Sequence, residues 1–172
     1  MESLSYVYRG RKISVKVEES IMPSGAKTTR EIVEHVGAVA VLPLVDKEDI
    51  ILLRQHRPVV GEWIYEIPAG TLEPSESPHE CAARELEEET GYKPGKLTEL
   101  FEMYIAPGYS TENLHSFAAF ELQPGVFNPS GGEEIEVVRK PLSEVVMMIK
   151  TNEIRDAKTI ATVLYYVRFG EG

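Results

Sequence analysis

Three carboxylates in this chain have a spacing suited to binding a divalent cation. Glu85, Glu88 and Glu89 stand at i, i+3 and i+4, so they share one face if their segment is helical. Such charges repel each other unless a cation neutralises them, and hard ions such as Mg2+ bind both carboxylate and phosphate oxygens. Bound ions of this kind stabilise the attacking and leaving oxygens in a phosphoryl displacement. The spacing indicates a metal site for phosphate chemistry, and the alternative is an acidic, solvated helix face.

Local signals predict that these glutamates lie on a helix. Ser77 is a suitable N-cap, Pro78 suits the first helical position, and Glu80 completes a capping box. No helix breaker follows until Gly91, which is a natural C-terminal stop. Cys81, the only cysteine of the chain, falls inside this helix, where we expect a buried apolar role rather than a nucleophile.

The wider stretch of residues 70–92, GTLEPSESPHECAARELEEETGY, resembles the Nudix box. It matches Gly-x5-Glu-x7-Arg-Glu-U-x-Glu-Glu-x-Gly-U, with U apolar, at every fixed position. The resemblance implies a metal-dependent hydrolase that cleaves a diphosphate linked to another moiety. It also implies that Glu76 fixes Arg84, that Arg84 orients the metal-binding glutamates, and that the carbonyl of Ala69 is a metal ligand.

Composition narrows the function classes. The chain has 172 residues and is 42% hydrophobic, which suits one domain with a sizeable core. Its formal net charge of -10 argues against nucleic acid or an anionic membrane as a partner, because both need a basic surface. It contains neither a long apolar run nor a signal-peptide pattern near Met1, so we expect a cytoplasmic protein.

The hydrophobic pattern predicts a mixed α/β fold. Residues 37–45, GAVAVLPLV, indicate a central strand, and 46–49 a polar turn that leads to a returning strand at 50–54. We expect an amphipathic helix over 156–169, with its buried stripe formed by Ile160, Val163, Leu164 and Val167. The expected fold class is the Nudix α/β/α sandwich with a mixed β-sheet. Further strands are expected around 5–8, 12–18, 30–35, 65–67, 97–104, 114–122 and 135–139, and a further helix over 143–150.

A second resemblance concerns the substrate. Pro107 stands 16 residues beyond Gly91, where ADP-ribose pyrophosphatases carry a proline. The segment 52–70, LLRQHRPVVGEWIYEIPAG, and the late run of residues 133–137, EEIEV, also resemble that subfamily. The resemblance implies hydrolysis of ADP-ribose to AMP and ribose 5-phosphate with two or three Mg2+ ions, Mn2+ being possible. A metal-activated water would attack one phosphorus.

The N-terminal region is expected to serve dimerisation. In this subfamily an N-terminal β segment exchanges across a two-fold axis, which implies a homodimer with residues 1–35 as that segment and 36–172 as the Nudix domain. The alternative is a hairpin that extends its own sheet. The resemblance also implies that Arg30 and Glu34 reach the adenosine part of the substrate in the partner subunit.

Other site residues are assigned by their place in the chain. Arg57, at the end of a predicted strand, is the main candidate for a phosphate contact, and Arg54 is its competitor. The subfamily places a further glutamate on a mobile loop, for which Glu133 and Glu134 are candidates after Gly131 and Gly132. Glu112 is a further candidate for the base. Trp63 and Tyr65 are candidates for stacking on adenine, and packing in the core is the alternative for each.

Two alternative functions stay open. One is a neighbouring Nudix activity on a nucleotide sugar or a dinucleoside polyphosphate. The other is a binding module that senses ADP-ribose without cleaving it. Such modules typically lose box glutamates, whereas Glu76, Glu85, Glu88 and Glu89 are all present here.

Overall fold

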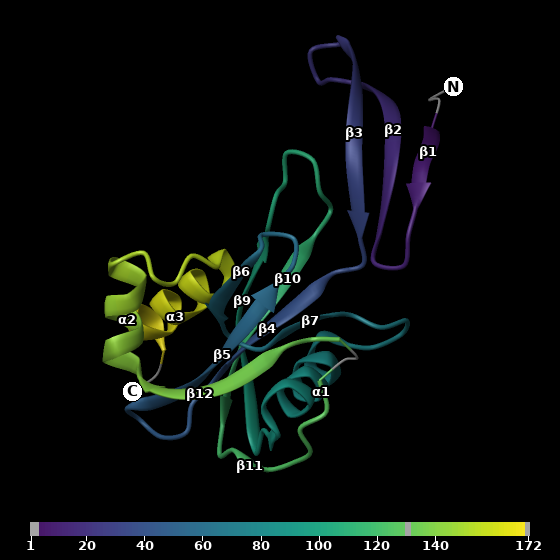
Figure 1. Ribbon diagram of the computed structural model, residues 1–172. Coiled ribbons are helices and arrows are strands. Elements are labelled where there is room, and N and C mark those ends of the chain that lie inside the picture. Colours follow the sequence, from purple (N-terminus) through teal and green to yellow (C-terminus); the bar gives the residue numbers. More distant parts are fainter. Residues whose placement is uncertain (1–3, 130–131, 171–172) are drawn as a thin grey trace.

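The computed structural model describes residues 4–129 and 132–170 of the chain (Figure 1). Its centre is a mixed sheet with strand order β7-β4-β10-β9. Strand β4 (Ala38–Pro43) is buried along its whole length and pairs in parallel with β10 (Asn113–Phe120). Strands β7 (Ala69–Thr71) and β9 (Lys96–Tyr104) complete this sheet with antiparallel pairings. The apolar run at 37–45 is therefore the central strand that its sequence predicts.

A second sheet has the order β12-β5-β6 and stands beside the first. It contains β5 (Asp49–Arg57), β6 (Glu62–Glu66) and β12 (Ile135–Pro141). Residues 50–54 form the expected returning strand, and an antiparallel bridge between Leu44 and Ile50 closes the polar turn. Beyond this bridge β5 forms its ladders with β12 and β6 and not with β4.

Helices cover the central sheet on two sides (Figure 1). Helix α1 (Pro78–Thr90) packs on one face, with Cys81, Ala82 and Leu86 against the β4 residues Val39 and Val41. Helices α2 (Leu142–Lys150) and α3 (Ala157–Phe169) pack on the other face, over a second apolar cluster. Because β4 contributes alternate residues to the two clusters, both of its faces are buried. This is the expected α/β/α sandwich.

The buried face of α3 differs from the predicted stripe. Val163 is buried, but Leu164 and Val167 are exposed. Thr159 and Thr162 are buried in their place. Their hydroxyls are hydrogen-bonded, Thr159 to the backbone N–H of Ile67 and Thr162 to Ser116. Satisfied hydroxyls remove the main cost of burying a polar group, so apolar periodicity alone did not identify this face.

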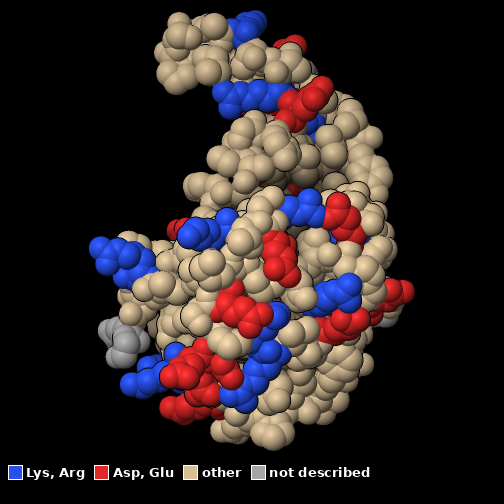
Figure 2. All heavy atoms as spheres, turned by 60° about the vertical axis from the view of Figure 1, so that its left-hand side comes forward, with Lys and Arg blue, Asp and Glu red and all other residues tan. Residues whose placement is uncertain are grey.

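The N-terminal strands form a separate antiparallel sheet in the order β1-β2-β3. Strands β1 (Leu4–Arg9), β2 (Ile13–Ile21) and β3 (Lys27–His35) project from the body, and Figure 2 shows a concave space beneath this arm. Val7, Tyr8 and Ile21 on it are more than half exposed. The exchange of this arm between two chains stays a prediction. The remaining short strands, β8 (Tyr92–Lys93) and β11 (Gln123–Pro124), pair at the far end of α1.

No helix in the described part of the chain has the length and apolar character needed to cross a membrane.

Candidate active site

Helix α1 begins and ends as its local sequence predicts. Ser77 Oγ accepts a hydrogen bond from the backbone N–H of Glu80, and the Glu80 carboxylate accepts one from the backbone N–H of Ser77. Pro78 occupies the first turn. Gly91 ends the helix in the left-handed region at φ 76° and donates its N–H to the carbonyl of Glu87. These caps fix the rotation and the start of the helix, and therefore the direction of its glutamates.

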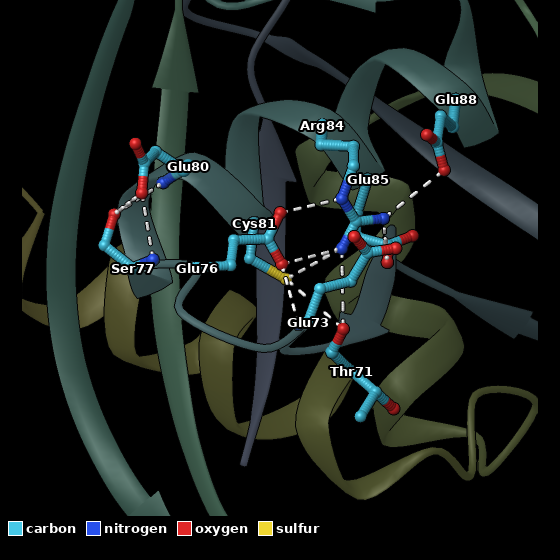
Figure 3. Close-up of polar contacts among 9 residues, drawn as sticks. All are labelled: Thr71, Glu73, Glu76, Ser77, Glu80, Cys81, Arg84, Glu85 and Glu88. Carbon is cyan, nitrogen blue, oxygen red and sulfur yellow. Dashed lines mark hydrogen bonds and ion pairs between the residues drawn. The ribbon is translucent and has the colours of Figure 1, made fainter. Parts of the chain in front are cut away.

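Arg84 is the centre of a polar network on this helix (Figure 3). Its guanidinium donates two hydrogen bonds to the Glu76 carboxylate, with Nε–Oε1 at 2.8 Å and Nη2–Oε2 at 3.0 Å. Nη1 donates to Glu85 at 2.6 Å and reaches Glu88 at 3.4 Å, and Nη2 also reaches the carbonyl of Thr71. Arg84 therefore ties the loop that precedes the helix to two of the three box glutamates, and the orienting role that the resemblance implies stays a prediction.

Glu76 is the anchor of that arginine. Hydrogen bonds from Arg84 lower the pKa of the Glu76 carboxyl to about 2, and a backbone N–H from Glu73 adds to the effect. The same pairing raises the pKa of Arg84. Both groups are therefore charged at neutral pH, and a bidentate pair of this kind also fixes the plane of the guanidinium.

Glu89 is the most deeply buried of the three box glutamates. It is 4% exposed, and its Oε2 accepts a hydrogen bond of 2.9 Å from the backbone N–H of Ala69. Burial raises the pKa of its carboxyl to about 8, and the neighbouring charges of Glu85 and Glu133 act in the same direction, against the hydrogen bond from Ala69. Burial also raises the pKa of Glu85. The carboxylates of Glu85, Glu89 and Glu133 therefore stand close enough together to repel one another.

A cavity of about 750 Å³ opens above these groups. Residues distant in the sequence meet there, because β5, β7, the middle and later part of α1 and the loops before β10 and β12 all contribute to its walls. The acidic side chains in the lining are those of Glu73, Glu85, Glu89, Glu112 and Glu133, and the basic ones are those of Arg11, Lys12, Arg57, Arg84 and Lys158.

The two glutamates of the late loop, Glu133 and Glu134, differ in their position relative to the cavity. Glu133 lines it, and its charge acts on Glu85 and Glu89. The side chain of Glu134 is exposed outside the lining, and its backbone carbonyl accepts a hydrogen bond from His56 N–H. The expected mobile Gly-Gly pair lies partly outside the described residues, since Gly131 is not among them.

Other expected site residues lie both in the cavity and outside it. Arg57, Glu112 and Ala69 line the cavity. Arg54 does not, because it pairs with Glu136 at 2.9 Å and stacks over the Trp63 ring. Tyr65 is partly buried and packs against the apolar cluster that α2 and α3 cover.

Three further candidates stand away from the cavity. Arg30 and Glu34 lie on the projecting β3, where Glu34 accepts a hydrogen bond from the Tyr6 hydroxyl and pairs with Lys16. Pro107 is exposed on the loop that joins β9 to β10. Within one chain these residues do not meet the box glutamates, so their contact with substrate stays a prediction.

Sequence reasoning missed several residues of the cavity. Glu66 and Lys158 form a buried ion pair at its edge, and Arg11 and Lys12 reach the lining from the turn between β1 and β2. The run RGRK at residues 9–12 was visible as a basic turn, but its place near the cavity depends on the fold.

The donor set suits a hard divalent cation, although the side chains are not gathered around one. Within the described part of the chain, no three His, Cys, Asp or Glu side chains converge in a metal-holding geometry, and Arg84 instead holds Glu85 and Glu88. Space for the Glu85 carboxylate exists only because Gly70 lacks a side chain, since a Cβ at that position would overlap it. Buried carboxylate oxygens with raised pKa values next to a backbone carbonyl are what a hard cation stabilises.

Comparisons with known proteins identify the family of this chain. A family model described as the NUDIX domain matches residues 34–163. An ADP-ribose pyrophosphatase of Bacillus subtilis (strain 168) is 40% identical over 161 residues, which cover 92% of this chain and 87% of the relative. A methanol dehydrogenase activator of Bacillus methanolicus is 36% identical over 162 residues, covering 92% and 87%. A GDP-mannose pyrophosphatase of Citrobacter koseri (strain ATCC BAA-895 / CDC 4225-83 / SGSC4696) is 39% identical over 140 residues, covering 75% and 72%.

A solved structure shows the same fold. It is described as the crystal structure of an ADP compounds hydrolase, with a TM-score of 0.86 and 24% identity over 97% of this chain and 91% of that chain. The family match spans most of the chain and includes the capped helix, the Glu76–Arg84 pair and the buried glutamates. This chain therefore belongs to the Nudix family of hydrolases.

Proposed function

We propose that this protein hydrolyses the diphosphate of ADP-ribose to AMP and ribose 5-phosphate with the help of Mg2+. The observation that carries the proposal is the cavity in which Glu85, Glu89 and Glu133 stand close to Arg57 and Lys158. A diphosphate brings negative charge that the basic side chains can bind, and carboxylates on the same wall can hold the cations that neutralise the rest.

The choice of ADP-ribose is supported by relatives and by sequence. The Bacillus subtilis relative named ADP-ribose pyrophosphatase covers nearly all of this chain. Pro107 and the segment before the box resemble the same subfamily. The relative named GDP-mannose pyrophosphatase makes a nucleotide sugar the competing substrate class.

Nudix hydrolases depend in general on divalent metal ions. Here Glu85, Glu88, Glu89, Glu133 and the carbonyl of Ala69 would hold two or three of them, with Mn2+ as a substitute for Mg2+. When bound, such ions neutralise diphosphate oxygens and acidify a bound water.

The chain's own residues would do the remaining work. Arg57 uses its Nε to pair with Glu66, so its terminal nitrogens can donate to diphosphate oxygens. A water attacks one phosphorus, a carboxylate takes its proton, and the bridging oxygen leaves on the other phosphate. Glu133 is the preferred base because it lines the cavity beside the box glutamates, and Glu112 is its competitor.

The protein would act as a homodimer in the cytoplasm, with residues 1–35 as an exchanged arm and 36–172 as the Nudix domain. Support comes from the arm itself, which projects from the body and exposes Val7, Tyr8 and Ile21. Arg30 and Glu34 on its third strand would then reach the partner's substrate. Sedimentation of the whole chain measures this directly, and a monomer at micromolar concentration would exclude the exchange.

The test of the activity is product analysis by chromatography with Mg2+ and a substrate panel of ADP-ribose, GDP-mannose, NADH and diadenosine polyphosphates. We expect ADP-ribose to be turned over fastest, to AMP and ribose 5-phosphate. A Glu89→Gln preparation serves as the control for contaminating hydrolases. Fastest turnover of GDP-mannose would replace the proposed substrate, and tight ADP-ribose binding without turnover would indicate a sensor.

A further inference from the structure

One buried carboxylate joins two cations at the edge of the cavity. Glu66, at the end of β6, is 3% exposed. Its Oε2 accepts a hydrogen bond of 2.7 Å from Arg57 Nε, and its Oε1 accepts one of 2.7 Å from Lys158 Nζ. The three residues come from β5, β6 and the first turn of α3, so only the folded chain brings them together.

Both cations keep N–H groups that have no hydrogen-bond partner in the described part of the chain. Arg57 uses only Nε, and its terminal nitrogens have no hydrogen bond there. Lys158 donates to Glu66 and, at 2.9 Å, to Asp156, which leaves one of its three N–H groups. Arg57 and Lys158 both line the cavity that also contains Glu85 and Glu89.

The backbone that carries Lys158 is firmly placed. Asp156 caps α3 by accepting hydrogen bonds from the backbone N–H and the hydroxyl of Thr159, at 3.0 and 2.6 Å. Thr159 Oγ1 in turn accepts a hydrogen bond of 2.9 Å from the backbone N–H of Ile67, the residue after Glu66. The start of α3 is thus hydrogen-bonded to the segment that leads into Ala69, and this contact fixes the backbone position from which the Lys158 side chain extends.

We infer that Lys158 binds the substrate diphosphate together with Arg57, and that Glu66 is the residue that positions both cations. This inference rests on the proposed function, because it assigns Arg57 and Lys158, the basic wall of the same cavity, to binding of the diphosphate. A diphosphate has oxygens on two adjacent phosphates, so two cations held side by side match it better than one. Preformed positions also spare the ordering of two long side chains on binding.

The alternative is a purely structural ion pair that fastens α3 to β6. Lys158→Met separates the two, because it keeps most of the methylene packing and removes the ammonium group. A diphosphate contact predicts a KM roughly 10- to 100-fold higher, the size expected for one charge-assisted hydrogen bond. Lys158→Arg should recover most of this loss, and Lys47→Met, on the exposed turn before β5, should change nothing.

The affinity for ADP-ribose should fall by the same factor when Lys158→Met is placed in a Glu89→Gln background and binding is followed by calorimetry. A melting temperature that falls while KM and affinity stay within twofold of their reference values would overturn the inference. For Glu66, the single variant Glu66→Gln and the double variant with Lys158→Met should lose kcat/KM non-additively, because Glu66 acts through the lysine. Additive losses would show that Glu66 does not position Lys158.

The role of Lys158 can be tested even if the proposed ADP-ribose hydrolysis is wrong. If the wild-type chain does not turn over ADP-ribose, the same variants are measured on the panel diphosphate that it turns over fastest. If it turns over none, binding of inorganic pyrophosphate in Mg2+ is compared between wild type and Lys158→Met. An unchanged pyrophosphate affinity would overturn the assignment of Lys158 in that case.

Discussion

Removing the charge of Glu89 should stabilise the metal-free protein and inactivate the enzyme. Glu89→Gln keeps the shape of the side chain, and its amide oxygen can still accept the hydrogen bond from Ala69 N–H. The change removes a carboxyl whose pKa rises to about 8 on folding, mainly because the group is 4% exposed. The variant therefore separates the cost of holding this charge in the fold from its use in catalysis.

The sign and size follow from proton linkage. Between pH 4.5 and about 8 the folded state holds the proton of Glu89 while the unfolded state has lost it, so stability falls as pH rises through this window. At about 1.4 kcal/mol per pH unit, the difference reaches on the order of 4 kcal/mol at pH 8, as an upper limit. In a chain of this size that corresponds to roughly 10 °C in melting temperature.

The assay is thermal unfolding in EDTA at pH 5 and pH 8. We expect Glu89→Gln to melt well above wild type at pH 8 and close to it at pH 5. Added Mg2+ should raise the wild-type melting temperature more than that of the variant, because only wild type presents the full set of carboxylates. Activity should fall roughly 100-fold or more, beyond the 10- to 100-fold typical of groups outside the metal shell.

The matched control is Glu153→Gln, which removes a carboxylate from the exposed turn after α2 and should melt like wild type at both pH values. Two results would refute the reasoning. One is a metal-free wild-type stability that does not change between pH 5 and pH 8. The other is a Glu89→Gln protein no more stable than wild type at pH 8.

Three further predictions concern the box and its helix. Gly70→Ala should lower kcat/KM at least about tenfold with little change in melting temperature, because the new Cβ displaces the Glu85 carboxylate; wild-type kinetics would contradict this. The Cys81 thiol should resist a disulfide reagent in the native state and react after unfolding, because burial raises the pKa of this thiol. Rapid labelling of the native protein would contradict this prediction. Ser77→Ala should cost about 1 kcal/mol in urea unfolding, through loss of the N-cap, and an unchanged midpoint would exclude that role.

The helix and its chemistry could be predicted because they depend on local rules. Ser77, Pro78 and Gly91 set the ends of α1, and within those ends the helical repeat alone places Glu85, Glu88 and Glu89 on one face. The central strand was equally plain, since an almost wholly apolar run of this length is typical of a strand with both faces covered. Even the Glu76–Arg84 pair was accessible, through the resemblance to the Nudix box.

Tertiary structure decided what depends on contacts between distant segments. The sequence offers Glu133 and Glu134 as neighbours of equal chemistry, and only the direction of the loop places the first in the cavity. Leu164 was expected in the core, but Thr159 and Thr162 are buried against the sheet in its place. Their hydroxyls can be buried because Ile67 N–H and Ser116 form hydrogen bonds with them.

The basic wall of the cavity is the clearest case. Arg57, Glu66 and Lys158 are held together by hydrogen bonds across as many as 92 residues of sequence separation. No periodicity or motif encodes such a pair, because its energy exists only after burial has removed water from Glu66 and brought both cations to it. The sequence by itself determined the capped acidic helix, the central strand and the family, whereas the folded structure decided which distant charges face the substrate.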